Sequence, residues 1–185
     1  KYVITASNAN RLNKIPEAEK LQFFYFDQLT EAVQEKEAEE IRYPEFDGED
    51  SLYIYFTSGS PGKPKGIIGK NKSLLNFVEW EVAEFQIDES FRCSQFISPY
   101  FDAFLRDVFV PLFAGATICM PTAEKNFFDP EVMISWIDTQ KINLIHCVPS
   151  VFRIFNDPSL SSKYFQDLKY ILLSGEKIIP GELKD

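Results

Sequence analysis

The sequence lacks several features that mark common protein classes. It holds 3 Cys, none in a C-x-x-C pair, and 1 His among its 185 residues. Disulfide frameworks need paired cysteines, and structural zinc sites need closely spaced Cys or His ligands, so neither is predicted. We expect the cysteines to be buried free thiols. A two-histidine metal site is excluded, and a Ser-His-Asp hydrolase is not supported because no G-x-S-x-G segment is present.

Positive charge is also scarce. Lys and Arg number 19 against 28 Asp and Glu, which gives a formal net charge of -9. Residues 31–50 hold nine acids and two bases, so most of the excess lies there. Nucleic acids and anionic membranes attract a cationic face, so we expect neither as a partner. We expect the acidic segment 29–50 to be a solvated helix or loop, and a partner-binding acidic patch is the alternative.

Long apolar runs are missing as well. The sequence has no stretch of about 18 apolar residues, the length needed to span a bilayer. Its N-terminus also lacks the basic-then-apolar order of a signal peptide. We therefore expect a cytoplasmic protein with no membrane partner. The hydrophobic share is 45% and Phe alone contributes 18 residues, which is typical of a packed globular chain. The length favours one domain over residues 1–185.

Strand and helix patterns alternate along the chain. Strands are expected over 2–5, 52–56, 91–97, 116–120, 142–148 and 168–173, with a further short apolar run at 23–26. Helices are expected over 73–85, 102–113 and 149–155, and another should begin at Asp129-Pro130-Glu131. The nearly continuous apolar run at 52–56 is typical of a strand buried on both faces. This alternation predicts an α/β fold with a largely parallel sheet flanked by helices.

A polar turn follows the strand expected at 52–56. Residues 57–66 hold three Gly, two Pro, three hydroxyl side chains and two Lys. Backbone N–H groups, hydroxyls and lysines that converge in such a turn can bind phosphate oxygens. The turn matches neither the Walker A pattern nor G-x-G-x-x-G. Composition alone leaves open a phosphate cradle and an ordinary flexible turn.

The stretch YIYFTSGSPGKPKG closely resembles [YF]-T-S-G-[ST]-[ST]-G-x-P-K-G, a signature of the adenylate-forming superfamily. That superfamily includes the amino-acid-activating domains of nonribosomal peptide synthetases, acyl-CoA ligases and luciferases. The sequence departs from the signature at Pro61, where the family has a hydroxyl residue. The resemblance implies that this loop binds the β and γ phosphates of ATP through Thr57, Ser58, Gly59, Ser60, Gly62, Lys63 and Lys65.

Two further segments resemble the peptide-synthetase branch of this family. FDAF at 101–104 is similar to F-D-x-S, whose aspartate pairs with the α-ammonium group of the substrate, although Phe104 replaces Ser. SGE at 174–176 is similar to the G-G-E turn beside adenine, which implies an adenine site at Gly175, Glu176 and Lys177. The resemblance implies a substrate pocket lined by Asp102, Ala103, Arg106, His146, Leu172 and Ser174. An alternative for the aspartate is that it caps the following helix.

The pattern Asp-Ala-Arg-His in this implied pocket resembles pockets that take acidic amino acids. A guanidinium binds a carboxylate through two parallel hydrogen bonds, and His146 would be a second donor. We therefore expect aspartate, a methylaspartate or, less favoured, glutamate as substrate. Two plainer alternatives stay open. Arg106 would pair with Asp102, one helical turn away, and His146 would bond to backbone within its strand.

The resemblance also implies a reaction. A carboxylate oxygen of the amino acid attacks the α-phosphorus of ATP, with Mg²⁺, and gives aminoacyl adenylate and pyrophosphate. The phosphopantetheine thiol of a peptidyl carrier protein then captures the adenylate. The carboxylate is already ionised at neutral pH, so no base is required.

The family's Mg²⁺-binding segment, hinge and catalytic lysine have no match in this sequence. We therefore expect an internal part of the large N-terminal subdomain, without a catalytic residue or metal ligand of its own, which does not turn over alone. The alternatives are a fragment of an acyl-CoA or aryl-acid ligase, and a non-catalytic interaction fragment.

Overall fold

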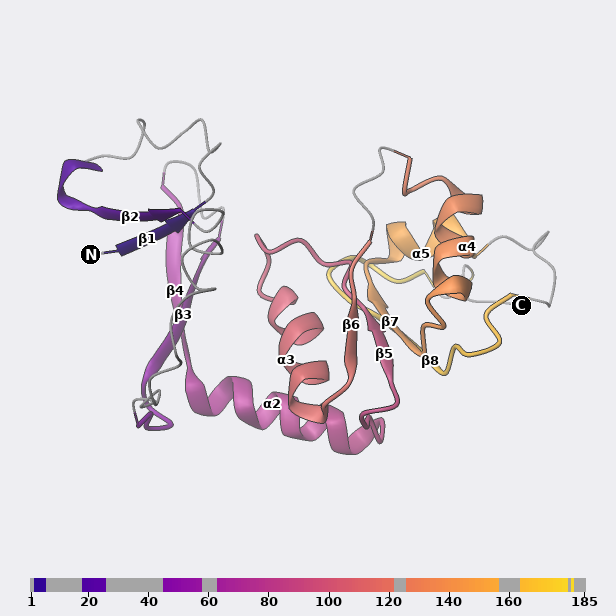
Figure 1. Cartoon of the computed structure of the whole chain (residues 1–185), viewed down its shortest axis with the longest axis horizontal. Coiled ribbons are helices and arrows are strands. Elements are labelled where there is room, and N and C mark those ends of the chain that lie inside the picture. Colours follow the sequence, from indigo (N-terminus) through magenta and orange to yellow (C-terminus); the bar gives the residue numbers. More distant parts are fainter. Residues whose placement is uncertain are drawn as a thin grey trace, which may run out of the picture. The chain divides into compact units, whose positions relative to one another are not determined.

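The computed structural model of the chain describes residues 2–5, 18–25, 45–57, 63–121, 126–156, 164–179 and 181. The chain divides into two compact units, Lys1–Glu45 and Phe46–Asp185. In the first unit, β1 (Tyr2–Thr5) pairs in parallel with β2 (Gln22–Tyr25), which follows the short helix η2 (Ala18–Lys20) (Figure 1). The strand expected at 2–5 is confirmed. Most of the acidic segment 29–50 lies outside the described residues.

A four-stranded parallel sheet forms the centre of the second unit. Its strands are β5 (Arg92–Ser94), β6 (Thr117–Cys119), β7 (Leu144–Cys147) and β8 (Tyr170–Leu173). They lie in the order β6-β5-β7-β8, and each neighbouring pair is parallel. The predicted α/β class with a largely parallel sheet is therefore confirmed, although these strands are shorter than the sequence pattern suggested.

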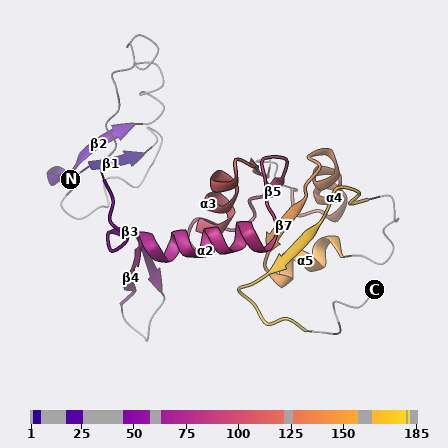
Figure 2. The ribbon, with the colours of Figure 1, turned by 90° about the horizontal axis from the view of Figure 1, so that it is seen from below.

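Helices cover both faces of this sheet (Figures 1 and 2). They are α2 (Asn71–Glu84), α3 (Phe104–Ala114), α4 (Pro130–Thr139) and α5 (Pro149–Phe155). Side chains of successive strand residues point to opposite faces. Accordingly, Leu144 of β7 belongs to the core cluster under α2 and α3, whereas Ile145 and Cys147 belong to the cluster under α4 and α5.

Local signals set the ends of two helices as expected. Asp129 is the N-cap of α4, and its Oδ1 accepts a hydrogen bond from the Glu131 N–H at 3.1 Å. Gly115 ends α3 in the left-handed region, with φ 71°, which costs a glycine least. At the start of α3 the N-cap position belongs to Ala103, and no side chain caps it. The alternative role of Asp102 as a helix cap is therefore not what the structure has.

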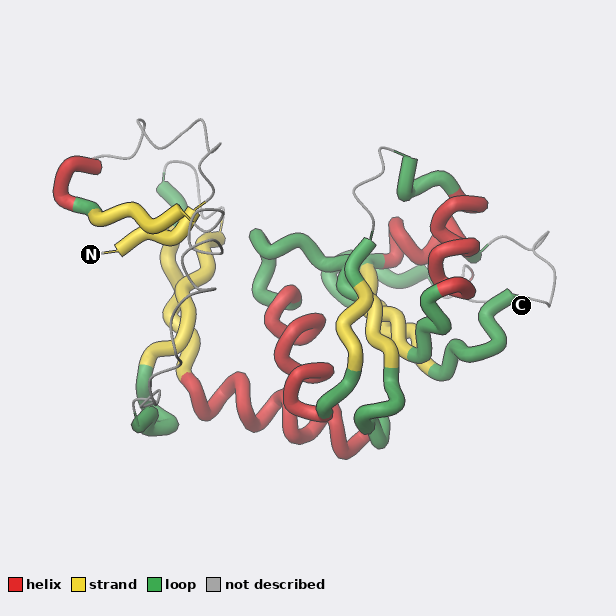
Figure 3. Tube along the Cα trace, in the orientation of Figure 1, coloured by secondary structure: helices red, strands yellow, loops and turns green. Residues whose placement is uncertain are grey.

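Strands β3 (Ser51–Thr57) and β4 (Lys65–Lys70) form an antiparallel hairpin of their own (Figure 3). A strand at 52–56 is confirmed, but its predicted burial on both faces is wrong, because Ile54 is 58% exposed and Phe56 is 66% exposed. β3 pairs only with β4 among the described strands, and Tyr53 and Tyr55 are its half-buried residues. β4 is not among the predicted strands.

The cysteines are buried free thiols, as predicted. Burial raises the pKa of Cys93 and of Cys147 to about 12, so both remain protonated and unreactive at neutral pH. No helix in the described ranges is long and apolar enough to cross a membrane. Nor do these ranges contain a group of three or more side chains suited to hold a metal ion.

Candidate functional site

A cavity of about 300 Å³ lies beside the hairpin, α2, α3 and the carboxyl ends of β7 and β8. Such ends of parallel strands are where α/β sheets bind ligands. The cavity is lined by five of the residues expected to contact substrate, namely Asp102, Ala103, Arg106, His146 and Ser174. We call it the polar cavity. The other lining residues are Tyr53, Ser73, Leu74, Phe77 and Leu105.

The sixth expected residue, Leu172, does not line the polar cavity. It lies opposite His146 in the β7–β8 ladder. Its side chain is partly buried against the apolar cluster that includes Leu74 and Val78. The structure therefore brings together residues from four separate segments, and leaves this leucine in the packing behind them.

Arg106 forms an ion pair with a residue that the sequence motifs do not include. Its Nε donates to Glu81 Oε1 at 2.8 Å and lies 2.7 Å from Oε2. The side chain of Glu81 is 1% exposed and that of Arg106 is 17% exposed. Burial raises the pKa of Glu81, and the hydrogen bond from the guanidinium partly offsets this. The partner of Arg106 is thus α2, and not Asp102 as the plainer alternative supposed.

The guanidinium still reaches the cavity. Among the described residues it donates through Nε alone, so the two Nη groups keep their fork geometry for a further acceptor. Its Cζ lies 5.6 Å from the centre of the Phe77 ring, a cation–π distance that helps to hold it. A planar, pre-positioned fork of this kind suits a carboxylate.

His146 is held by side chains on both sides of its ring. Nδ1 lies 2.7 Å from Asp107 Oδ1, and Nε2 lies 2.7 Å from Ser174 Oγ. Asp107 Oδ2 also accepts the backbone N–H groups of Phe96 and Ile97, at 3.1 and 3.0 Å. The alternative in which this histidine bonds to backbone is therefore not observed.

A second cavity, of about 400 Å³, shares a wall with the polar cavity. Asp102, Ala103 and Ser174 line both. The second cavity is further lined by Gly175 and Glu176, two of the residues expected beside adenine, together with Phe96, Ile97, Ser98, Phe101, Val148 and Val151. Lys177, the third, is exposed and is not among its lining residues.

Glu176 also holds the start of α5. Its carboxylate accepts hydrogen bonds from the Ser150 N–H at 2.9 Å and from the Ser150 Oγ at 2.8 Å. A carboxylate near a helix N-terminus satisfies donors that the helix leaves unpaired. This contact fixes the turn after β8 against α5, beside the second cavity.

The expected phosphate loop is described only at its two ends. Thr57 and Lys65 face each other across the β3–β4 ladder, and Lys63 and Lys65 are exposed. Ser58, Gly59, Ser60 and Gly62 lie outside the described residues. Burial and the negative charge of Asp102 together raise the pKa of Tyr55, which indicates that the hairpin approaches this carboxylate near its loop end.

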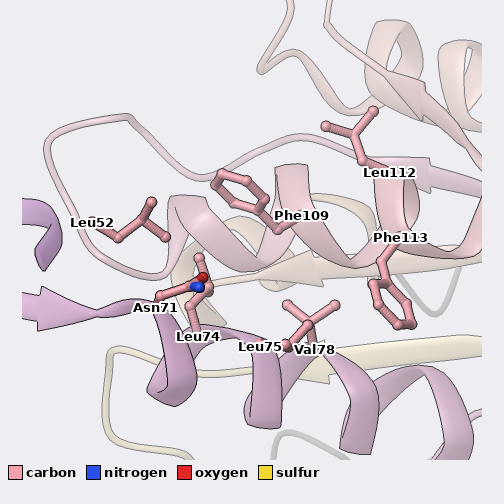
Figure 4. Close-up of a pocket in the computed structure, with 8 residues that line it drawn as sticks. All are labelled: Leu52, Asn71, Leu74, Leu75, Val78, Phe109, Leu112 and Phe113. Carbon is pink, nitrogen blue, oxygen red and sulfur yellow. The ribbon is translucent and has the colours of Figure 1, made fainter. Parts of the chain in front are cut away.

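A third cavity, of about 400 Å³, opens between α2 and α3 on another side (Figure 4). Its lining is apolar apart from Asn71, and consists of Leu52, Leu74, Leu75, Val78, Phe109, Leu112 and Phe113. We call it the apolar groove. It contains no charged side chain and none of the expected site residues, so it offers no chemistry of its own.

Two residues of the site escape the motif-based prediction, Glu81 and Asp107. Glu81 lies at i+3 from Val78 and i+7 from Leu74, on the buried stripe of α2. Asp107 directly follows the predicted Arg106, and these two are the charged residues of a helix whose other side chains are apolar. A charge within a buried stripe was the available signal, since such a charge needs a partner.

The chain is similar in sequence to known proteins. The family model described as AMP-binding enzyme matches residues 1–184. Gramicidin S synthase 2 of Brevibacillus brevis is 36% identical over 129 residues, which is 70% of this chain and 3% of that protein. L-2-aminoadipate reductase of Schizosaccharomyces pombe is 38% identical over 98 residues, 53% of this chain and 7% of that protein.

A solved structure has the same fold. The crystal structure of the nonribosomal peptide synthetase FmoA3 in its AMPPNP-bound form matches 98% of this chain with a TM-score of 0.77. The two are 22% identical, and the match covers 19% of the FmoA3 chain. The present chain thus spans a small part of each relative.

Proposed function

The chain belongs to the AMP-binding enzyme family, and on that premise we propose that it carries the amino-acid pocket of an adenylating enzyme. The proposed reaction joins an amino acid to AMP at the expense of ATP and releases pyrophosphate. The proposed next acceptor is the phosphopantetheine thiol of a peptidyl carrier protein, as in nonribosomal peptide synthesis. The setting we propose is the cytoplasm.

The observation that carries the proposal is the polar cavity. Residues from the segment before α3, from α3 itself, from β7 and from the turn after β8 line one space of about 300 Å³. An amino acid in this space would place its α-ammonium group at Asp102, because a desolvated ammonium needs a carboxylate partner. Asp102 also lines the neighbouring cavity, where we place the adenosine part of ATP.

The role of these residues is positioning and charge stabilisation. The amino-acid carboxylate is the nucleophile and is ionised at neutral pH. Asp102 orients it toward the shared wall of the two cavities, and the loop after Thr57 would hold the phosphates through backbone N–H groups and lysines. Mg²⁺ would neutralise the leaving pyrophosphate. We assign its ligands to other residues, because the family's Mg²⁺-binding segment has no match in this sequence.

We further propose a substrate with an acidic side chain. In this proposal the two Nη groups of Arg106 bind the side-chain carboxylate, and Ser174, held by His146, is a second contact. Aspartate and methylaspartate are the first candidates, and glutamate follows. The relative named for 2-aminoadipate, a longer dicarboxylic amino acid, makes that compound a further candidate for this pocket.

The test is amino-acid-dependent exchange of pyrophosphate into ATP, measured on the complete protein with a panel of amino acids that includes 2-aminoadipate. The expected result is the highest rate with an acidic amino acid. A preference for an apolar amino acid would reject the acidic class. Asp102 is exposed in the free chain, so only a bound substrate would shield it from water. In the same assay Asp102→Ala should lower the rate for every amino acid by about 30-fold or more, since an ammonium group left without its carboxylate in a desolvated pair costs about 2–5 kcal/mol.

The competing functions give different outcomes. An acyl-CoA or aryl-acid ligase has no substrate ammonium group, so its activity would be indifferent to Asp102→Ala. A non-catalytic interaction protein would bind neither ATP nor an aminoacyl-adenylate analogue in calorimetry. The 185-residue chain alone is expected to show no exchange, since it is proposed to hold the pocket without the catalytic lysine of the family.

A further inference from the structure

The hydrogen bonds of Asp107 and His146 determine where the histidine carries its hydrogen. Asp107 Oδ2 is engaged by two backbone N–H groups, and Oδ1 faces His146 Nδ1 at 2.7 Å. A carboxylate only accepts hydrogen bonds, so Nδ1 must be the donor. The side chains are 0% exposed for Asp107 and 2% exposed for His146, so water does not compete for these positions.

The neutral histidine then fixes the direction in which the Ser174 hydroxyl donates its hydrogen. A neutral imidazole has a single N–H, and with that hydrogen on Nδ1 the other nitrogen, Nε2, can only accept. Ser174 Oγ, 2.7 Å away, must donate its hydrogen to Nε2. Towards the polar cavity it therefore presents oxygen lone pairs alone, which suit a donor and repel a carboxylate.

A proton on His146 reverses this arrangement. Nε2 then donates to Ser174 Oγ, and the hydroxyl hydrogen is free to point into the polar cavity. We infer that His146 takes up a proton when a substrate with a side-chain carboxylate binds, so that Ser174 becomes a donor to that carboxylate. Asp107 is the positioning residue of this switch. The inference rests on the proposed acidic substrate, and it adds a proton to the binding step.

The charges around the histidine favour the same change. The charged and titratable side chains around it come from α2, α3, the segment before α3 and β3, and they are Glu81, Arg106, Asp107, Asp102 and Tyr53. Three carboxylates stand against one guanidinium, which Glu81 already engages. The substrate ammonium balances Asp102, but its side-chain carboxylate adds negative charge beside Asp107 and Glu81, whose side chains are 0% and 1% exposed. A proton on the histidine offsets that addition.

The first test is nitrogen NMR of the complete protein labelled at histidine. The two ring nitrogens of His146 are assigned as the signals that His146→Asn removes. At a pH where the free ring is neutral, the Nδ1–H tautomer is expected. Saturating L-aspartate should protonate both nitrogens, whereas L-asparagine, of the same shape without the charge, should leave the tautomer unchanged. Calorimetry in two buffers of different protonation enthalpy should count about one proton taken up per aspartate and about none per asparagine.

Asp107→Asn separates this switch from a merely structural role. The amide oxygen of the new side chain must face the two backbone N–H groups, so its NH₂ group faces His146 Nδ1 and forces the Nε2–H tautomer. Ser174 then donates into the polar cavity while the ring is neutral. Proton uptake with aspartate should fall from about one to about zero. Asp138→Asn is the matched control, because Asp138 also accepts a backbone N–H, that of Phe165 at 2.7 Å, away from the cavity.

The outcomes distinguish this inference from the proposed function. Aspartate that binds without proton uptake overturns the inference and leaves the acidic substrate class standing. Uptake that persists in His146→Asn overturns it too, because the proton then goes to another group such as Glu81. A chain that binds asparagine and rejects every acidic amino acid overturns both the acidic class and the proton-linked step. The wild-type measurements stand even if a variant fails to fold.

Discussion

The same two helices, α2 and α3, line two cavities of opposite character. The polar cavity contains Asp102, Arg106, His146 and Ser174, whereas the apolar groove contains no charged side chain. Leu74 contributes to both. On α3 the charged residues lie in the first turn, and Phe109, Leu112 and Phe113 follow in the later turns.

The difference shows how position along one helix separates packing from chemistry. The first turn of α3 lies beside the carboxyl ends of β7 and β8, where parallel strands deliver polar side chains to one edge of the sheet. There, each buried carboxylate has a partner on another element, Arg106 for Glu81 and His146 for Asp107. In the apolar groove the same helix pair offers apolar surface, and no charged side chain that could orient a ligand. The predictions below alter one side of this comparison at a time.

The largest effect on stability is expected for Arg106→Met. Glu81 is 1% exposed, so removing its cation leaves a buried and uncompensated carboxylate. The free energy of unfolding should fall by about 3–5 kcal/mol, measured by urea denaturation. The control is Lys72→Met, which removes an exposed ion pair with Glu49 and should leave the free energy of unfolding nearly unchanged. Equal losses in the two variants would show that burial does not strengthen the pair at the polar cavity.

A smaller effect is expected for Gly69→Ala, which disturbs the polar cavity from the hairpin. A Cβ at Gly69 would lie 1.9 Å from Cζ of Tyr53, so the tyrosine ring must move. Because Tyr53 lines the polar cavity, aspartate binding should weaken, and unfolding should become easier by about 1–3 kcal/mol. Gly66→Ala in the same strand meets its nearest atom at 3.4 Å and should leave binding unchanged. If Gly69→Ala leaves the affinity for aspartate unaltered, the hairpin does not contribute to the binding site.

A pH effect is expected from Glu81. Burial raises its pKa above the ordinary value of 4.5, so the folded chain holds this proton to a higher pH than the unfolded chain does. The contribution of Glu81 to the free energy of unfolding is therefore fully present below its pKa in the unfolded chain. It is lost as the pH rises through the raised pKa of the folded chain. Urea denaturation over this range should show a decline that Glu81→Gln removes. Glu84→Gln, an exposed acid of the same helix, should retain it.

The smallest effect is expected in the apolar groove. Leu112 is 60% exposed, so Leu112→Asn should change the free energy of unfolding by about 0.5 kcal/mol or less and leave aspartate binding unchanged. Met133→Ala, which truncates a side chain of α4 with 0% exposure, should cost about 2–5 kcal/mol in the same denaturation experiment. Loss of aspartate binding in Leu112→Asn would contradict the division between the two cavities.

Much of the second unit follows from local signals in the sequence. The N-cap at Asp129 and the stop at Gly115 act within a few residues, so the ends of α4 and α3 can be predicted without tertiary information. Five of the six expected substrate residues share the polar cavity because a motif fixes their order relative to strands and turns.

The features that the sequence did not predict depend on contacts between residues far apart in the chain. The apolar run at 52–56 does not reveal that β4 is its one partner among the described strands, in a two-stranded ribbon that leaves Ile54 exposed. Glu81 lies 25 residues from Arg106 in the sequence, and Asp107 lies 39 residues from His146. No local pattern joins such pairs, because they meet only when helices pack on the sheet.

The crystal structure of the complete protein with its acidic amino acid bound would test the central claim most directly. We expect the amino acid to lie in the polar cavity. Its α-ammonium group should be in hydrogen-bond contact with Asp102, and its side-chain carboxylate should contact the Nη groups of Arg106. An amino acid bound elsewhere, or bound in this cavity with its ammonium group turned away from Asp102, would contradict it.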